Sequence, residues 1–117
     1  MTNRKDLAIA ATLDVVAILA FVAIGRRSHH EEGAVVGGIL RVAAPFLIGL
    51  TVGWIVAKAW KAPSDATTGM IIWPVTVVVG MLLRRFLFDD GTALPFIIVA
   101  SAFTGVLLVG WRALRRR

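Results

Sequence analysis

Four long apolar runs dominate the sequence, at about residues 7–24, 39–57, 66–83 and 93–111. Each is about 18–19 residues long, close to the ~20 that a helix needs to cross ~30 Å of hydrocarbon. Inside a bilayer the backbone must satisfy its own hydrogen bonds, so we expect runs of this length to be helices. The sequence therefore predicts an all-α polytopic membrane protein, a four-transmembrane-helix bundle that forms a single domain over residues 1–117, with connectors at 25–38, 58–65 and 84–92.

The composition excludes a soluble domain. Hydrophobic residues make up 58% of the chain, charged residues make up 17%, and the mean hydropathy is +0.83. Soluble domains carry about 25% charged residues, and a chain of 117 residues has too small an interior to bury this much apolar surface. The net charge of +6 would suggest nucleic acid on a soluble chain, but here the charges flank the apolar runs, so no nucleic-acid partner is expected.

The 13 basic residues divide unevenly between the two sides of the predicted bundle. Four spans return the chain to its starting side, so the side with both termini also holds the connector 58–65. That side carries eight basic residues: Arg4, Lys5, Lys58, Lys61, Arg112, Arg115, Arg116 and Arg117. The other side carries five: Arg26, Arg27, Arg41, Arg84 and Arg85. Since Lys and Arg are retained in the cytoplasm, this bias predicts cytoplasmic N- and C-termini.

Asp14 is the sharpest polar feature, because it lies eight residues into the first apolar run. A carboxylate there costs several kcal/mol and usually faces the bundle interior. Counting ~1.5 Å per residue predicts a polar layer at its depth, formed by Thr51, Trp54, Thr76 and Thr104. By the same count no basic residue shares that depth. Hydroxyls or the indole N–H are the possible donors in this layer. We therefore expect Asp14 to be protonated or hydrogen-bonded to hydroxyls, without a salt bridge.

Three interpretations of Asp14 remain open at this stage. The residue is a polar clamp that joins helices, a proton- or cation-coupled site, or a contact to a partner protein.

A second group of polar residues lies on the side opposite the termini: Arg26, Arg27, His29, Arg41, Arg84, Asp89 and Asp90. Its charges of both signs predict loop-to-loop ion pairs, and Arg41 and Arg84 are placed to snorkel toward lipid phosphates. The alternative is an anion or headgroup site between the two hairpins. Adjacent histidines diverge and no third His or any Cys is present, so a solvated loop without metal is expected at His29-His30.

The two halves of the chain share a repeated pattern. Arg26-Arg27 with Glu31-Glu32-Gly33 matches Arg84-Arg85 with Asp89-Asp90-Gly91, Val52-Gly53-Trp54 matches Val109-Gly110-Trp111, and Phe46 matches Phe103. The pattern predicts a duplicated helical hairpin, with chance similarity between two membrane hairpins as the alternative.

Small residues four apart allow helices to approach closely. They occur at Gly49/Gly53, Ser101/Gly105 and Ala8/Thr12, and they suit packing inside the bundle or a homodimer equally well.

Several of these residues together resemble a known family. They are Asp14, the run Gly25-Arg26-x-Ser28-His29, Pro45-Phe46 with Gly53-Trp54, Arg84, and Gly110-Trp111-Arg112. Over nearly its whole length the chain resembles the small prokaryotic membrane proteins of the domain of unknown function 3054 family. The resemblance implies four spans in a bacterial or archaeal plasma membrane, and it implies no activity.

No nucleophile–base arrangement or glycine-rich phosphate loop is present, so neither an enzyme nor a cofactor is expected. This favours a non-catalytic structural or accessory membrane protein, whose partners are lipids and a second copy or a larger complex. The alternative is a small proton-coupled transporter that works as a dimer around Asp14. Small multidrug resistance transporters are similar in architecture, with four spans and an acidic residue midway along the first. They use glutamate at that place, whereas this chain has aspartate and a clear charge bias.

Overall fold

The computed structural model describes residues 4–29, 35–87 and 94–115, and it describes the backbone alone at 25–29, 35–39, 94 and 96. These described ranges contain four α-helices: α1 (Arg4–His29), α2 (Val35–Ala57), α3 (Ala66–Phe86) and α4 (Leu94–Arg115). A short 3-10 turn, η1 (Ala59–Lys61), lies between α2 and α3. All four helices are long and apolar enough to cross a membrane, as the sequence predicted.

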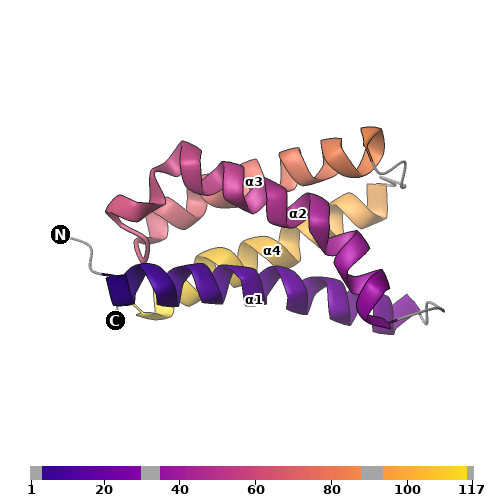
Figure 1. The fold of residues 1–117 in the computed structure, drawn as a ribbon, viewed down its shortest axis with the longest axis horizontal. Coiled ribbons are helices and arrows are strands. Elements are labelled where there is room, and N and C mark those ends of the chain that lie inside the picture. Colours follow the sequence, from indigo (N-terminus) through magenta and orange to yellow (C-terminus); the bar gives the residue numbers. More distant parts are fainter. Residues whose placement is uncertain (1–3, 30–34, 88–93, 116–117) are drawn as a thin grey trace.

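The helices run up and down in an antiparallel bundle (Figure 1). Helices that follow one another in the chain pack together, and the ring closes where α1 meets α4. The contact between α2 and α3 is the most extensive, and α1 packs more sparsely on α2 and α4. The bundle is 45 Å long, which matches a bilayer of about 40–45 Å with its headgroups. Both termini and the α2–α3 connector lie at the same end.

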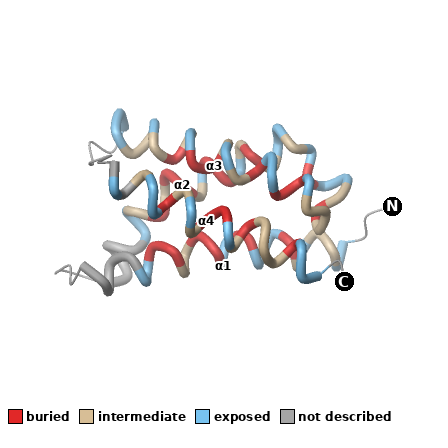
Figure 2. Tube along the Cα trace, turned by 180° about the vertical axis from the view of Figure 1, so that it is seen from behind, coloured by how far each residue is buried: buried red, intermediate tan, exposed pale blue. Residues whose placement is uncertain are grey.

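The bundle is apolar on its outside as well as its inside. Large apolar side chains are exposed on every helix, among them Val16, Ile55, Met70 and Val106, the last at 71%. Figure 2 shows the buried residues confined to the inward stripes of the helices. An apolar outer surface of this kind is stable in lipid and not in water, so the chain is a membrane protein.

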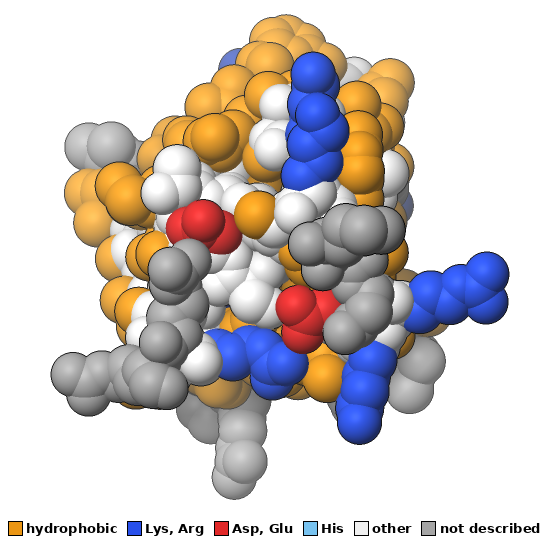
Figure 3. Space-filling view, turned by 90° about the vertical axis from the view of Figure 1, so that its left-hand side faces the viewer, with side chains coloured by type: hydrophobic (Ala, Val, Ile, Leu, Met, Phe, Trp, Pro, Cys, Tyr) orange, Lys and Arg blue, Asp and Glu red, His pale blue; other side chains and the backbone are white. Residues whose placement is uncertain are grey.

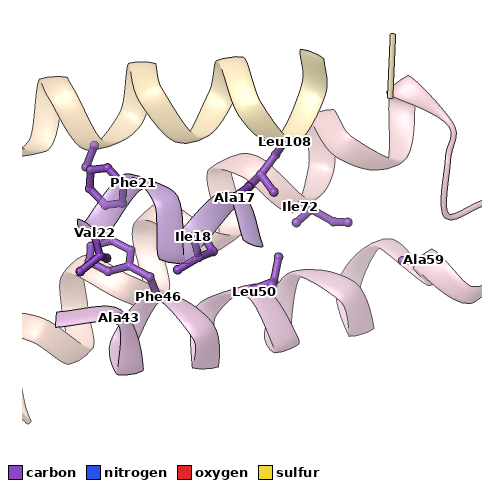
Figure 4. Packing of buried hydrophobic residues seen from close by; sticks show 11 residues of the cluster. Ala17, Ile18, Phe21, Val22, Ala43, Phe46, Leu50, Ala59, Ile72 and Leu108 are labelled. Carbon is purple, nitrogen blue, oxygen red and sulfur yellow. The ribbon is translucent and has the colours of Figure 1, made fainter. Parts of the chain in front are cut away.

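The core is built around one stripe of α1. Ala17, Ile18 and Phe21 lie on this stripe and pack against Phe46 and Leu50 of α2 (Figure 4). Spacings of three and four residues place these side chains on one face of α1, as an amphipathic helix requires. The same face carries Asp14, one turn before Ile18, so the core stripe directs the carboxylate into the bundle.

Two of the three small-residue motifs serve packing inside the bundle. A Cβ atom on Gly49 would lie 2.6 Å from the backbone oxygen of Thr76, and one on Gly53 would lie 3.1 Å from that of Ile72. A Cβ on Gly105 of α4 would meet the Trp73 ring, whose Nε1 donates to the Ser101 carbonyl at 2.8 Å. Ala8 and Thr12 of the third motif are exposed on α1.

The helices extend beyond the predicted apolar runs. α1 continues to His29, so Arg26, Arg27 and His29 are helical, where a connector was predicted. Arg84 and Arg85 likewise belong to the last turn of α3. Apolar composition marks the part of a helix that crosses hydrocarbon, whereas backbone hydrogen bonding continues through polar residues at the membrane surface. The sequence therefore located the spans and placed these helix ends too early.

Candidate functional site

Asp14 is completely buried, at 0% exposure, although its neighbours Leu13 and Val15 face outward from α1. Each carboxylate oxygen accepts two hydrogen bonds. Oδ1 accepts from Nε1 of Trp111 at 2.9 Å and from Nη1 of Arg112 at 2.8 Å. Oδ2 accepts from Nε1 of Trp54 at 2.8 Å and from Nη2 of Arg112 at 2.7 Å. All four acceptor positions of an ionised carboxylate are thus filled.

Arg112 is as buried as Asp14, also at 0% exposure, and forms a bidentate ion pair with it. Its Nε donates to the Pro63 carbonyl at 2.8 Å, and its Nη1 also donates to the Leu108 carbonyl at 2.9 Å. The guanidinium carbon lies 4.4 Å from the centre of the Trp111 ring, which adds a cation–π contact. The cation therefore has protein partners on several sides at once.

Every helix contributes to this centre. α1 supplies Asp14, α2 supplies Trp54, and α4 supplies Trp111 and Arg112. α3 contributes a space: a Cβ atom on Gly69 would lie 2.8 Å from Cδ of Arg112, so the absence of a side chain there lets the arginine stem pass. The α2–α3 connector adds the Pro63 carbonyl. We call Asp14, Trp54, Trp111 and Arg112 the carboxylate–arginine centre.

The prediction that Asp14 has no salt bridge was wrong. Counting residues along α4 placed Arg112 at the membrane surface. Such a count gives the position of the Cα atom and not that of the guanidinium group. Side chains on a helix point back toward its N-terminus. Because α4 runs toward the end with both termini, this direction carries the guanidinium of Arg112 back into the bundle, where it meets Asp14.

The predicted polar layer around Asp14 is formed in part. Nε1 of Trp54, one of the possible donors in that layer, donates to Asp14, whereas the predicted hydroxyls do not. The hydroxyls of Thr51 and Thr104 instead bond carbonyls of their own helices, that of Leu47 at 3.0 Å and that of Ala100 at 2.6 Å. Thr76 is buried at 0% exposure, and its hydroxyl has no hydrogen-bond partner among the described residues. None of the three threonines thus makes a hydrogen bond to the carboxylate.

Trp111 and Arg112 were missed as site residues, although the repeat pointed to the first of them. Trp54 and Trp111 occupy matching positions of the two halves, and each donates its indole N–H to one oxygen of Asp14. Phe46 and Phe103 also match, and their ring centres lie 5.7 Å and 5.8 Å from that of Phe21. Matching residues of α2 and α4 therefore contact the same two residues of α1, Asp14 and Phe21, as a duplicated hairpin predicts.

Most residues of the second predicted group, the charged cluster on the side opposite the termini, have no described side chain. Arg26, Arg27 and His29 lie in the last turns of α1, where only the backbone is described. Asp89 and Asp90 lie outside the described residues, so the predicted ion pairs with them remain a prediction. Arg41 is exposed on α2 and Arg84 is half-buried on α3. Within the described ranges no cluster of three or more potential metal ligands occurs.

The comparison with family models bears on the whole chain. The model described as "Protein of unknown function (DUF3054)" matches residues 11–115. The chain belongs to this family. The match to DUF3054 includes all four residues of the carboxylate–arginine centre and leaves out the first ten residues of the chain. Comparisons with curated proteins and with solved structures find no match.

Replacing either indole at the centre is expected to destabilise the protein by similar amounts. Trp54→Phe and Trp111→Phe each remove one N–H donor from a buried carboxylate, and a hydrogen bond to a charged group contributes about 1.5–3 kcal/mol. Reversible unfolding in mixed micelles, followed by circular dichroism, measures the loss. Trp60→Phe is the matched control because Trp60 is 45% exposed, and its effect is expected within about 0.5 kcal/mol. Equal stabilities for all three variants would refute the role of the indoles.

Proposed function

We propose that this DUF3054 protein is a non-catalytic structural or accessory component of a prokaryotic plasma membrane. The observation that carries the proposal is the saturated carboxylate–arginine centre. Asp14 and Arg112 neutralise each other, and their hydrogen bonds join α1, α2, α4 and the α2–α3 connector. A buried polar network with its donors and acceptors satisfied holds one arrangement of helices against others.

The geometry supports a structural role better than proton transfer. A carboxylate that carries protons through a membrane needs an acceptor position that a proton can reach. Both oxygens of Asp14 already accept two N–H donors each, and the residue is completely buried. A proton would have to displace a donor, which would leave the buried guanidinium of Arg112 without its counter-charge.

We further propose that the end with both termini faces the cytoplasm. Five exposed basic residues lie at that end: Arg4, Lys5, Lys58, Lys61 and Arg115. The burial of Arg112 removes one charge from the bias counted in the sequence, since its partner Asp14 cancels it. The end with both termini still carries more basic residues than the opposite end. Positive residues are retained on the cytoplasmic side.

A small proton-coupled transporter is the second candidate function. The observation in its favour is the ion pair itself, because ionisable residues inside a membrane commonly mark a transport pathway. In such a mechanism protonation of Asp14 would release Arg112 and change the contact between α1 and α4. A bundle of four helices encloses little room, so this function needs a dimer, for which the exposed Ala8/Thr12 face of α1 is available.

Proton flux into proteoliposomes separates the two functions. A pH-sensitive dye inside the vesicles reports flux under an imposed pH gradient, for the wild-type protein and for Asp14→Asn/Arg112→Gln, which removes both charges and leaves neutral amides in their place. We expect no difference between them. Native mass spectrometry of the protein extracted into lipid nanodiscs from its own membrane is expected to retain a partner chain at fixed stoichiometry. Proton flux abolished by the double variant would overturn the structural proposal and favour the transporter.

A further inference from the structure

The turn that joins α2 to α3 has an unusual combination of anchored and exposed residues. Ala59 is completely buried in the core, and Pro63 is bonded through its carbonyl to Arg112. Lys58, directly before the first anchor, and Trp60 and Lys61, between the two, are exposed. Lys61 N donates to the Lys58 carbonyl at 3.0 Å, which closes the turn. The turn therefore holds two lysines and an indole at the membrane surface on a fixed backbone.

Lys58 adopts a backbone conformation that favours glycine. Its φ is 51° and its ψ is 51°, the left-handed region in which a helix commonly ends with glycine. For a residue with a Cβ atom this conformation costs about 1–2 kcal/mol. Among the described residues, Lys58 is the one non-glycine residue with positive φ. A lysine at this position therefore forgoes stability, which is consistent with a use for its side chain.

The surroundings of the turn are both basic and apolar. Figure 3 looks onto this end, where basic side chains project from the rim. Two acidic residues also lie at this end: Asp6 accepts from Nη2 of Arg115 at 3.0 Å, and Asp65 accepts from Thr67 N at 3.0 Å as the cap of α3. Along α2, Ile55 and Val56 are exposed at 60% and 58% and lead from the turn into the membrane.

We propose that the turn Lys58–Lys61 is a binding site for one anionic phospholipid. The lysine ammonium groups bind the headgroup phosphate, the indole of Trp60 lies at the glycerol level, and the acyl chains lie along Ile55 and Val56. A free phosphate ion would use the two lysines alone, whereas a lipid uses the exposed indole and the apolar surface as well. The site rests on the membrane location of the chain and deepens the proposed function by naming the lipid class.

Quenching of tryptophan fluorescence by brominated lipids tests the site. The full-length protein is placed in nanodiscs of phosphatidylcholine that contain brominated phosphatidylglycerol or, at equal bromine content, brominated phosphatidylcholine. The difference between the wild-type protein and Trp60→Phe isolates the signal of Trp60. We expect the anionic lipid to quench Trp60 selectively. Because each basic residue near anionic lipid contributes about 1 kcal/mol, Lys58→Gln/Lys61→Gln should lower the selectivity about 30-fold, or about 5-fold per lysine.

Matched variants separate this site from a general attraction. Arg4→Gln/Lys5→Gln removes the same charge at the same end, from α1, and is expected to leave most of the selectivity in place. Lys58→Gly keeps the left-handed backbone and is expected to raise the thermal midpoint in detergent while lowering selectivity about 5-fold. Circular dichroism confirms that each variant is folded.

Three results would overturn the proposal. They are equal quenching by the two lipids, an equal loss of selectivity in the two double-glutamine variants, and displacement of the lipid signal by millimolar inorganic phosphate, which would indicate a phosphate site. Quenching does not depend on which leaflet the turn faces or on transport. The lipid site can thus be refuted while the proposed structural role stands, and the structural role can be refuted while the lipid site stands.

Discussion

Replacing Arg112 with methionine is expected to destabilise the folded protein by about 3–5 kcal/mol, the usual cost of removing one member of a buried ion pair. Methionine keeps an unbranched apolar stem in the space beside Gly69, so the change removes little besides the guanidinium. The loss leaves Asp14 as an uncompensated carboxylate at 0% exposure, and leaves the Pro63 carbonyl without its Nε donor. Reversible unfolding in mixed micelles measures the free energy.

The chain supplies a matched control for this prediction. A second arginine of α4, Arg115, pairs with a second aspartate of α1, Asp6, at 3.0 Å, and the two side chains are 40% and 38% exposed. Arg115→Met is expected to cost about 0–1 kcal/mol, as exposed ion pairs do. The two variants differ mainly in burial. If Arg112→Met and Arg115→Met lowered the free energy of unfolding equally, burial would not determine how much the Asp14–Arg112 pair contributes to stability.

Replacing Gly49 with alanine is expected to separate α2 from α3 and to destabilise the bundle by about 1–3 kcal/mol, as overpacking typically does. The new Cβ atom would lie 2.6 Å from the Thr76 carbonyl oxygen and 3.1 Å from the Gly80 backbone nitrogen. These are backbone atoms, so no side-chain rotation relieves the contact. Thermal unfolding followed by circular dichroism measures the loss.

Gly110→Ala is the control, because a Cβ atom there meets nothing within 4 Å. Alanine is the better helix former, so this variant is expected to gain up to about 1 kcal/mol. Opposite signs for the same substitution in α2 and in α4 would establish that close helix approach, and not glycine content, governs packing. A stabilised Gly49→Ala variant would contradict the packing described for α2 and α3.

The spans were predictable because length and apolarity of a run translate directly into a membrane helix. The sequence also singled out Asp14 and placed Trp54 beside it, since both lie on membrane helices at a similar depth. The ends of the helices were harder to predict, because at Arg26 and Arg84 the composition becomes polar while the helix continues. Composition therefore identifies the apolar part of a helix but not the residue at which the helix ends.

The partner of Asp14 was not predictable by counting positions. Arg112 is one of several arginines near the C-terminus, and its Cα lies toward the membrane surface. Its place in the centre depends on the direction of its side chain, on the space at Gly69 and on the position of the Pro63 carbonyl, which are tertiary facts. The repeat offered a usable signal, because Trp111 matches Trp54, which was predicted to lie beside Asp14. Trp111 directly precedes Arg112, so the match also indicated that Arg112 lies close to Asp14.

A double-mutant cycle on Asp14 and Arg112 tests most directly whether their ion pair holds the helices together. Asp14→Asn, Arg112→Gln and the combined variant are unfolded reversibly in mixed micelles, and the coupling energy follows from the four stabilities. The bidentate geometry at 2.7 Å and 2.8 Å predicts a coupling near the upper part of the usual range, about 2–3 kcal/mol. Single losses that add to within about 0.5 kcal/mol would contradict a direct interaction between the two residues.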